Sequence, residues 1–572
     1  MTRSTLLTLG LLTGLGLAAT PLTASATVAD LLYVGGNIIT VNPAQPTAEA
    51  LAVKDGRILA VGSRAALEKA HAGAATQKID LAGKTLTPAF IDPHSHYFSA
   101  LSVANQVNLF PPPAGPGKDI PSILAQLKKF RDSHKIAPGV MIIAYGYDDT
   151  AMPGRIGLTR DDLDADFPDN PVMVTHVSMH GAVLNSLALK KYNITAATKT
   201  PPGGIITRKP GSNEPAGLVM EMAYLPIFAA LPKPTTAEEL SWSQAAQQLY
   251  AQAGITTAHE GATHASDLAL MQRVGAAGGN QIDIVAYPFI TELEEILKSN
   301  PPASFGTYQN RLKLGGAKIT IDGSVQGRTA LFTTPYLVDG PNGEKAWKGV
   351  APFTQQQLNQ MVKRVYDLGL PLDLHANGDG AIDMLLRAHE FAAAGDLEKD
   401  RHVTAVHSQF VRQDQLDKYL QYKITPSFFT QHTYFFADTH LILRGQQQTD
   451  FISPMRTAID MGLRPSNHTD FVVTPLDQLF VMWTAVNRIS RNGVLIGGAE
   501  RITPLEALQA ITLNAARQHG DEQSKGSLEP GKLADLVILS GNPLTVEPMQ
   551  IKDIKVLETF KEGRSIYRAA KE

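Results

Sequence analysis

The chain has 572 residues, of which 44% are hydrophobic and 18% are charged, so it suits a well-packed globular protein and is not mostly disordered. Its 51 Lys and Arg residues against 54 Asp and Glu residues give a formal net charge of -3, too small for general electrostatic binding to nucleic acid. The absence of cysteine excludes disulfide frameworks, cysteine zinc clusters, iron–sulfur centres and thiol nucleophiles. Any bound metal must therefore be held by His, Asp, Glu or a modified Lys.

The N-terminal residues have the pattern of an export signal. Arg3 precedes an apolar stretch over residues 6–20, and Ala24-Ser25-Ala26 fits the small-x-small cleavage rule. A membrane anchor is the alternative, but about 15 apolar residues are short for a span. We therefore predict a signal peptide over residues 1–26 and a periplasmic or secreted mature protein that has no membrane segment.

Both ends of the mature chain have the texture of β-structure. Residues 27–87 contain short alternating or apolar runs separated by turn residues such as Gly35-Gly36 and Asp55-Gly56, and residues 521–572 repeat this pattern. We expect the two segments to pair into one composite domain beside the residues between them.

Residues 88–520 alternate short buried-type strands with amphipathic helical stretches, which indicates a parallel α/β fold. Eight strands are expected, at residues 87–92, 254–259, 282–287, 314–321, 371–375, 402–407, 423–428 and 462–468. This number favours a (β/α)₈ TIM barrel over a doubly wound open sheet, and its chemistry should lie where the strands end. The connection over about residues 99–240 is too long for a loop and predicts an insertion that forms a lid or a substrate wall.

Metal-type side chains follow several of these strands. His94 and His96 form a His-x-His pair after the first strand, where alternate residues can reach one ion. His375 and His407 each close a strand, and Asp470 follows another. A lone His-x-His pair is often only a surface feature, but five such residues at one barrel mouth predict a metal site.

Lys318 lies inside an apolar strand, where burying an ammonium group is costly. It could form a buried ion pair with Asp322. It could also react with CO₂, and the resulting carbamate would bridge two metal ions.

An ordered series of motifs spans nearly the whole mature chain. The segments are TLTPAFIDPHSH (85–96), AKITIDGS (317–324), HANGDGAID (375–383), AVHSQF (405–410), SFFTQHTYFFAD (427–438), NHTD (467–470), TAVNRISRNG (484–493) and KGSLEPGKLADLVIL (525–539). The series resembles the amidohydrolase superfamily, and within it amidohydrolase family 3, the branch that includes N-substituted formamide deformylases.

The resemblance implies a distorted (β/α)₈ barrel, a flanking β-sandwich from both chain ends, and a site for one or two divalent metals, usually zinc. His94, His96 and Asp470 would hold one ion, His375 and His407 the other, and carboxylated Lys318 would bridge them. The family varies at the Lys position, so the resemblance leaves both one and two metals open. Thr469 precedes Asp470 where the family most often has serine.

Further residues match family positions at which substrate contacts are expected. The candidates are His180, Asn185, Glu221 and Asp379, and His432 is added because it flanks an aromatic run, residues 434–436, that could form a pocket wall. Turn or helix-cap roles are the alternative for Glu221 and Asp379. His259 and Glu260 close the second strand and could support the metal ligands, whereas His71, His134, His389 and His519 are expected at the surface.

These residues predict a metal-dependent hydrolase of carbon–nitrogen bonds other than peptide bonds. A metal-activated water would attack a small amide, formamide or cyclic amide, with Asp470 as general base and then general acid. An ester or lactone hydrolase is the alternative within enzymes, and a non-catalytic protein resembling exoenzyme regulators is the alternative outside them. The complete ligand set argues against the latter. Barrels of this type often dimerise, so a homodimer is also expected.

Overall fold

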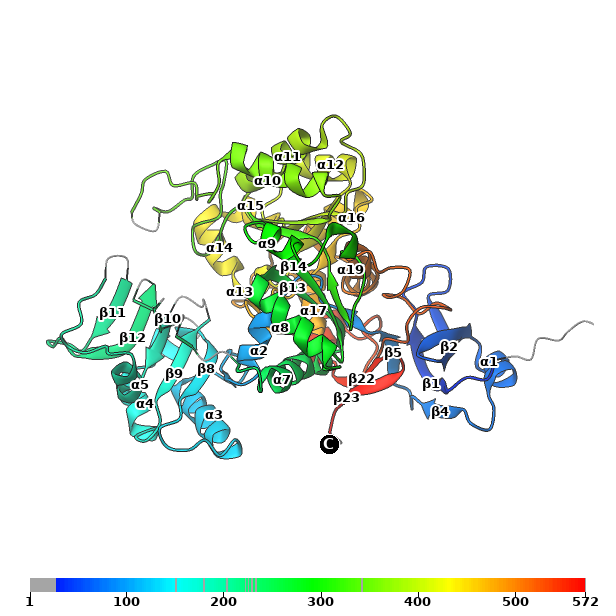
Figure 1. The fold of residues 1–572 in the computed structure, drawn as a ribbon, viewed down its shortest axis with the longest axis horizontal. Helices are drawn as coiled ribbons and strands as arrows, with labels where there is room; N and C mark the ends of the chain where they lie inside the picture. The colour runs from blue at the N-terminus through cyan, green and yellow to red at the C-terminus, as the bar shows by residue number, and fades with distance from the viewer. Residues whose placement is uncertain are drawn as a thin grey trace, which may run out of the picture.

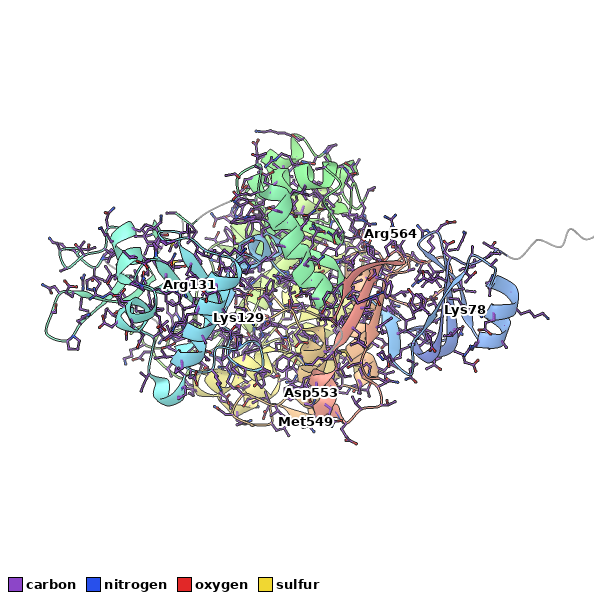
Figure 2. The ribbon with its side chains drawn as sticks, turned by 90° about the horizontal axis from the view of Figure 1, so that it is seen from below. Lys78, Lys129, Arg131, Met549, Asp553 and Arg564 are labelled. Atoms are coloured by element: carbon purple, nitrogen blue, oxygen red, sulfur yellow. The ribbon has the colours of Figure 1, made fainter. Side chains whose placement is uncertain are left out.

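A computed structural model describes residues 27–149, 152–177, 181–201, 204–221, 223–224, 226–227, 230–231, 234–340 and 343–570. The predicted signal peptide lies outside this range. A central barrel separates two flanking regions, formed by strands of the insertion on one side and by the N-terminal strands on the other (Figure 1). The same order is visible at right angles to this view, where Lys129 and Arg131 mark the insertion and Lys78 marks the N-terminal strands (Figure 2).

The two ends of the chain form one eight-stranded sheet, in the order β23-β22-β21-β5-β1-β2-β3, with β4 paired to β1. The strands are β1 (Leu31–Ile39), β2 (Thr47–Lys54), β3 (Arg57–Gly62), β4 (Gln77–Asp80), β5 (Thr85–Pro88), β21 (Leu536–Leu539), β22 (Val556–Lys561) and β23 (Arg564–Arg568). The ends meet where β21 runs antiparallel to β5, with Leu536 opposite Pro88. Helix α1 (Arg64–His71) follows β3 and is capped by Ser63.

The barrel consists of two parallel sheets, ordered β15-β14-β13-β6 and β16-β17-β18-β19-β20. Their strands are β6 (Phe90–Ile91), β13 (Ile255–Thr263), β14 (Asp283–Pro288), β15 (Leu312–Leu314), β16 (Ala317–Thr320), β17 (Leu372–Ala376), β18 (Val403–His407), β19 (Ile424–Phe428) and β20 (Ser466–Asn467). A parallel bridge between Phe289 and Lys318 joins them along one seam. Along the other seam, the amide of Asp470 donates to the carbonyl of His94 over 3.0 Å. These contacts give a TIM-barrel-like α/β fold.

Three expected strands differ from those observed. The strand expected at 314–321 is two strands, because the chain turns at Gly315-Gly316 and β15 pairs with β14 while β16 pairs with β17. A Cβ at Gly316 would lie 2.3 Å from the carbonyl oxygen of Pro371, so this close approach requires glycine. The strand expected at 87–92 divides between the terminal sheet and the barrel, and the strand expected at 462–468 is reduced to β20.

Helices cover the outside of the barrel (Figure 1). They are α2 (Tyr97–Val103), α7 (Glu239–Gln252), α8 (Ala265–Ala276), α9 (Leu293–Leu297), α10 (Gln355–Asp367), α11 (Asp379–Ala393), α12 (Gln413–Tyr422), α13 (His432–Phe435), α14 (Ala437–Arg444), α15 (Gln446–Asp450), α16 (Met455–Asp460), α17 (Gln478–Asn487), α18 (Pro504–Ala510) and α19 (Leu513–Gln518). Helix α10 shows how the sequence specifies them: Thr354 and Gln357 form a capping box, and Leu358, Val362 and Val365 make its buried face.

The insertion has its own sheet, in the order β11-β12-β10-β9-β8-β7. Its elements are β7 (Val107–Asn108), α3 (Ile120–Ser133), β8 (Ile142–Tyr147), α4 (Arg160–Asp166), β9 (Val172–His176), β10 (Gly181–Leu184), α5 (Ser186–Lys191), β11 (Gly204–Arg208) and β12 (Pro215–Glu221). Leu127, Leu163 and Val174 belong to a core that is separate from the barrel core. An ion pair between Asp148 and Arg491, with 2.9 Å between Oδ2 and Nη1, connects the insertion to the barrel.

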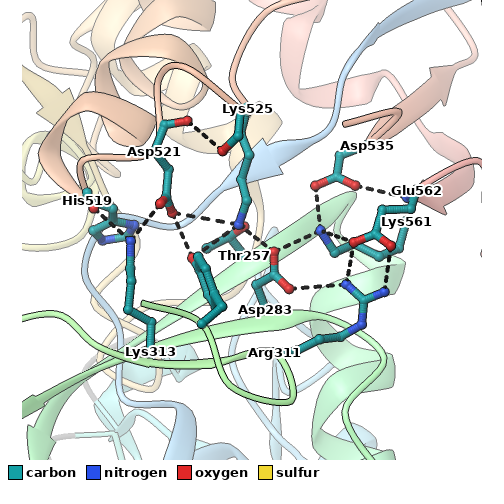
Figure 3. Close-up of polar contacts among 12 residues, drawn as sticks. Thr257, Asp283, Arg311, Lys313, His519, Asp521, Lys525, Asp535, Lys561 and Glu562 are labelled. Carbon is teal, nitrogen blue, oxygen red and sulfur yellow. Dashed lines mark hydrogen bonds and ion pairs between the residues drawn. The ribbon is translucent and has the colours of Figure 1, made fainter. Parts of the chain in front are cut away.

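A buried group of charges joins the barrel to the C-terminal segment (Figure 3). Asp283, at the start of β14, accepts hydrogen bonds from Lys525 and Lys561. Lys313 donates to Asp521 over 2.7 Å, and Arg311 pairs with Glu562. All the lysines are at most 3% exposed, so each depends on its carboxylate partner. Within the described part of the chain, no helix combines the length and apolar composition needed to cross a bilayer.

Candidate metal centre

The metal-type side chains identified in the sequence gather at the carboxyl ends of the barrel strands. His94 and His96 follow β6, and Asp470 follows β20, which closes the barrel beside β6. His375 lies near the end of β17, and His407 is the last residue of β18. Because parallel strands end on one rim of a barrel, these elements bring the side chains together.

Two imidazoles and one carboxylate define the first part of the centre. Oδ1 of Asp470 lies 3.3 Å from Nε2 of His96 and 3.6 Å from Nε2 of His94. This oxygen is buried and makes no hydrogen bond of normal geometry with any described residue. A buried carboxylate oxygen between two imidazole nitrogens fits a divalent cation, which would satisfy all three groups.

His375, His407 and Lys318 complete the cluster. Nε2 of His407 lies 3.1 Å from Nδ1 of His375, and the rings of His407 and His94 are 5.3 Å apart. Nζ of Lys318 lies 3.3 Å from Nε2 of His94. His94, His407 and Asp470 can each place one ligand atom within 4.8 Å of the other two. The six residues therefore form one continuous group.

Backbone conformation redirects one of these side chains. In the strand register His407 pairs with Ala376, so strand alternation would place it on the opposite face from His375. The φ of His407 is 69° and that of Ser408 is 44°, both in the left-handed region. This break in the alternation, a strained conformation typical of functional sites, lets the ring of His407 reach His375.

A glycine gives His94 the space that it occupies. A Cβ at Gly261 would lie 2.4 Å from Cε1 of His94 and 2.8 Å from its Nδ1. Both distances are shorter than van der Waals contact allows. A shift of the β13 backbone away from His94 would disturb the pairing of β13 with β14. The position therefore requires glycine.

Burial determines the protonation states of three of the four histidine ligands, the exception being His96, whose pKa Asp470 raises against the effect of burial. Burial lowers the pKa of His375 to about 3 and, together with the charge of Lys318, holds the pKa of His94 well below its usual range. Burial and neighbouring His375 act in the same direction on the pKa of His407. These imidazoles are neutral at pH 7, which is the form that binds metals.

Burial also lowers the pKa of Lys318 to about 8, against the opposing attraction of Asp373 and Asp470. About a tenth of this amine is therefore unprotonated at pH 7, far more than for a lysine with the ordinary pKa of about 10.4. An unprotonated amine is the form that reacts with CO₂.

Asp322 is not the partner of Lys318, so the ion-pair alternative is wrong for the described residues. Its carboxylate instead accepts the backbone amides of Leu331, Asn377 and Gly378, each over 2.9 Å. It thereby fixes the segment that follows β16 against the start of α11.

Two buried residues at the centre were not identified in the sequence. Nε2 of His468 lies 3.0 Å from Nδ1 of His407, and Nδ1 of His468 lies 3.0 Å from Oγ of Ser427. Asp373 is fully buried on β17, two residues before His375. The His-x-Asp spacing of His468 and Asp470 was a usable signal, because it repeats the spacing of His94 and His96.

Two expected substrate contacts are structural instead. The side chain of Asn185 accepts from the amides of Val172 and Ala188 and donates to the carbonyls of Phe167 and Asn170, which occupies both ends of its amide.

Asp379 accepts from the amide and hydroxyl of Thr333 and from Arg412. It anchors the start of α11, as its turn or cap alternative predicts.

The remaining substrate candidates are His432, His180 and Glu221. His432 is buried, with its ring 4.1 Å from that of Phe429 and 6.3 Å from that of His407. It therefore lies in the wall beside the centre. His180 lies outside the described residues, and of Glu221, the last residue of β12, only the backbone is described.

The histidines expected at the surface divide into two pairs. His71 and His134 are partly or fully exposed. The expectation is wrong for His389 and His519, which are 0% and 7% exposed. The buried ring of His389 keeps hydrogen-bond partners for both nitrogens: the hydroxyl of Tyr366 at 2.7 Å and the carbonyl of Leu397 at 3.1 Å.

Comparisons with known proteins show which family and which fold the chain shares. A sequence profile described as the amidohydrolase family matches residues 77–567, and one described as an imidazolonepropionase-like composite domain of bacteria matches residues 50–74. The chain is 26% identical to N-substituted formamide deformylase of Arthrobacter pascens, over 93% of this chain and 97% of the relative. It is 30% identical to the protein LONG AFTER FAR-RED 3 of Arabidopsis thaliana, over 94% and 92%. Its fold is similar to that of an uncharacterized metal-dependent hydrolase from Pyrococcus horikoshii OT3, with a TM-score of 0.69, 23% identity, and coverage of 91% and 99%.

Proposed function

Because the chain belongs to the amidohydrolase family, we propose that it hydrolyses a carbon–nitrogen bond, other than a peptide bond, in a small amide, formamide or cyclic amide. The observation that carries this proposal is the convergence of His94, His96, His375, His407 and Asp470 at one barrel mouth. A relative named for formamide hydrolysis supports this substrate class.

The proposed cofactor is one or two Zn²⁺ ions. His94, His96 and Asp470 would hold one ion, and His375 and His407 would hold the other. The buried oxygen of Asp470 and the neutral imidazoles favour this assignment. When bound, a divalent cation polarises a carbonyl group and lowers the pKa of water from about 15.7 to about 7.

Lys318 would bridge the two ions as a carbamate. The unprotonated Nζ attacks the carbon of CO₂, a C–N bond forms, one C=O π pair becomes the anionic oxygen, and the displaced proton passes to solvent. The neutral fraction of this buried amine favours the reaction. The reaction would convert the ammonium group of Lys318, which is costly to bury, into an anionic carbamate, which metals bind.

Asp470 performs the proton transfers in this proposal. The carboxylate oxygen that does not hold the ion would take a proton from the attacking water and return it to the leaving nitrogen, so one carboxylate would serve as base and then as acid. The contacts of Oδ1 with His94 and His96 support a role of this carboxylate at the centre over a helix-cap role. His432 lies in the adjoining wall, where it would contact the substrate.

Domain organisation and location complete the proposal. Residues 27–87 and 521–572 would form a composite β-sandwich domain, which the shared terminal sheet and the match to a composite domain support. Residues 88–520 would form the hydrolase barrel, with an insertion at about 99–240. Removal of residues 1–26 would release the protein to the periplasm or the medium, where it would act as a homodimer on small molecules.

An activity screen tests the function. Zinc-loaded protein should turn over at least one member of a panel of formamides, N-acyl amino acids, hydantoin-like rings and lactones, and a chelator should abolish that turnover. Asp470→Asn protein from the same purification controls for contaminating hydrolases. Turnover of lactones alone would replace the amide assignment with an ester assignment, and zinc-loaded protein without any turnover would favour a non-catalytic role.

A further inference from the structure

A row of polar side chains leads from the metal centre into the barrel interior. Nδ1 of His94 lies 3.1 Å from Nδ1 of His259, which β13 contributes. Nε2 of His259 lies 3.4 Å from Oδ2 of Asp373, which β17 contributes. His259 and Asp373 are both 0% exposed. The row therefore joins a predicted metal ligand to a fully buried carboxylate through one intermediate ring.

The end of the row makes few polar contacts apart from the row itself, although the charge of Lys318 and the hydroxyl of Thr404 act on Asp373. Neither oxygen of Asp373 makes a hydrogen bond of normal geometry with the described residues, and the same holds for Nε2 of His259. Burying an uncompensated carboxylate costs several kcal/mol. The 3.4 Å between Nε2 of His259 and Oδ2 of Asp373 is within ion-pair range and close to hydrogen-bond range. We therefore pair the imidazole of His259 with the carboxylate of Asp373.

The contacts assign a consistent position to every ring proton. Nε2 of His94 faces the centre, because it lies 3.3 Å from Nζ of Lys318 and 3.6 Å from Oδ1 of Asp470. An imidazole that binds a metal through Nε2 carries its proton on Nδ1. His94 then donates to Nδ1 of His259, whose own proton must be on Nε2, facing Asp373.

We propose that His259 and Asp373 are positioning residues that hold His94 in the tautomer and orientation required for metal binding. The inference rests on the proposed function, since it requires a metal at the centre. Partners of this kind fix the ring of a metal-binding histidine and raise its basicity, and their loss typically weakens metal binding by about 10–100-fold.

The surroundings of His259 favour this role over a catalytic one. The ring of Tyr287 lies 4.8 Å from that of His259, and the ring of His519 lies 5.4 Å from it. His259 is fully buried among these rings and contacts His94, so it acts through His94.

Asp373 is also the register partner of Lys318 on the adjacent strand, which gives it a second role as the counter-ion of that lysine. If Asp373 were only this counter-ion, Asp373→Asn would weaken metal binding equally in the wild-type and His259→Leu backgrounds. The two roles therefore differ in a measurable way.

The test measures zinc affinity, by competition with a chelating dye at fixed bicarbonate, for the full chain and its variants. His259→Leu should weaken zinc binding by about 10–100-fold. His259→Gln should recover part of this loss, because its amide oxygen accepts from His94 and its amide N–H donates to Asp373. Asp373→Asn should weaken binding in the wild-type background and add little in the His259→Leu background, since the row is already broken there.

His389→Leu is the matched control, because it removes a buried histidine that bonds to Tyr366 and Leu397. It should lower the melting temperature and leave the zinc affinity unchanged. Folded His259→Leu protein with a zinc affinity within about twofold of wild type, against the expected loss, would overturn the inference, as would additive effects of the two substitutions. If His259→Leu does not fold, the same cycle is measured with His259→Gln.

These outcomes separate the inference from the proposed function. Wild-type protein that binds no zinc contradicts the metal centre itself, and the inference falls with it. Wild-type protein that binds zinc as tightly as its His259 and Asp373 variants contradicts the inference alone.

Discussion

Lys318 and Asp373 lie opposite each other on adjacent parallel strands, β16 and β17, and both side chains are buried. An ammonium and a carboxylate in this arrangement compensate each other's charge. Conversion of Lys318 to a carbamate would remove that compensation and place two anions inside the barrel, an arrangement that only nearby cations could stabilise. Carbamate formation and metal binding should therefore depend on each other.

We expect zinc content to respond to bicarbonate. Apo protein loaded with zinc in bicarbonate should hold more metal than protein loaded without it, up to two ions per chain by elemental analysis. Lys318→Ala should lose this response and most activity, and short carboxylic acids that enter the vacated space should restore part of both. A Lys318→Ala enzyme with wild-type metal content and rate would reduce Lys318 to a structural residue.

Asp470→Asn should separate chemistry from metal binding. The substitution keeps the size of the side chain but removes the base, so kcat should fall by roughly 10²–10⁴, the range typical of lost acid–base catalysis. Metal content should fall much less, because four histidines remain. Measuring kcat and bound zinc on one preparation checks both expectations. A folded, metal-loaded variant within about tenfold of the wild-type rate would remove Asp470 from the mechanism.

Gly261→Ala should displace His94, because the new methyl group would lie 2.4 Å from Cε1 of the ring. Overpacking of this kind typically costs about 1–3 kcal/mol, and we expect weaker zinc binding together with a lower melting temperature. Gly541→Ala is the control, since its nearest neighbour would be 3.6 Å away. Equal zinc affinities for the two variants would contradict the close packing of Gly261 against His94.

Stability should depend on Asp283 in a pH-dependent manner. Burial alone would raise the pKa of Asp283, but Lys525 and Lys561 hold it well below its usual range (Figure 3). A depressed pKa contributes stability above the unfolded-state value of about 3.9 and loses it as the pH falls through the folded-state value.

Asp283→Asn should therefore lower the melting temperature at pH 7, with a cost of about 3 kcal/mol for the unpaired lysines. The difference from wild type should shrink below about pH 4. Asp367→Asn, which removes an exposed pair with Lys363, should change little at any pH. Thermal unfolding of the three proteins from pH 3 to 8 checks this, and a difference that does not vary with pH would exclude the proposed linkage.

The sequence was informative where a residue's role follows from its place on a strand. His94, His96, His375, His407 and Asp470 could be identified because strand ends share one rim of a barrel. Asp373 could not, because an acidic residue in an apolar strand matches no spacing rule and its partner His259 is 114 positions earlier in the chain.

Side-chain partners explain the other differences. The motif around Asn185 could not reveal that four backbone groups already occupy its amide. The left-handed backbone of His407 is equally invisible in a strand pattern, although it directs the ring to the centre.

The pairing of β21 with β5 has a consequence for the order of synthesis and folding. Leu86 lies opposite Ile538, so an early segment of the chain receives its neighbour only after more than nine tenths of the 572 residues have been synthesised. Before β21 is made, one edge of β5 is unpaired. Asp283 in the barrel also lacks its hydrogen-bond donors Lys525 and Lys561 until the C-terminal segment is present. Pairing across such a separation is slow. The terminal sheet is therefore the part of the fold that the chain completes last.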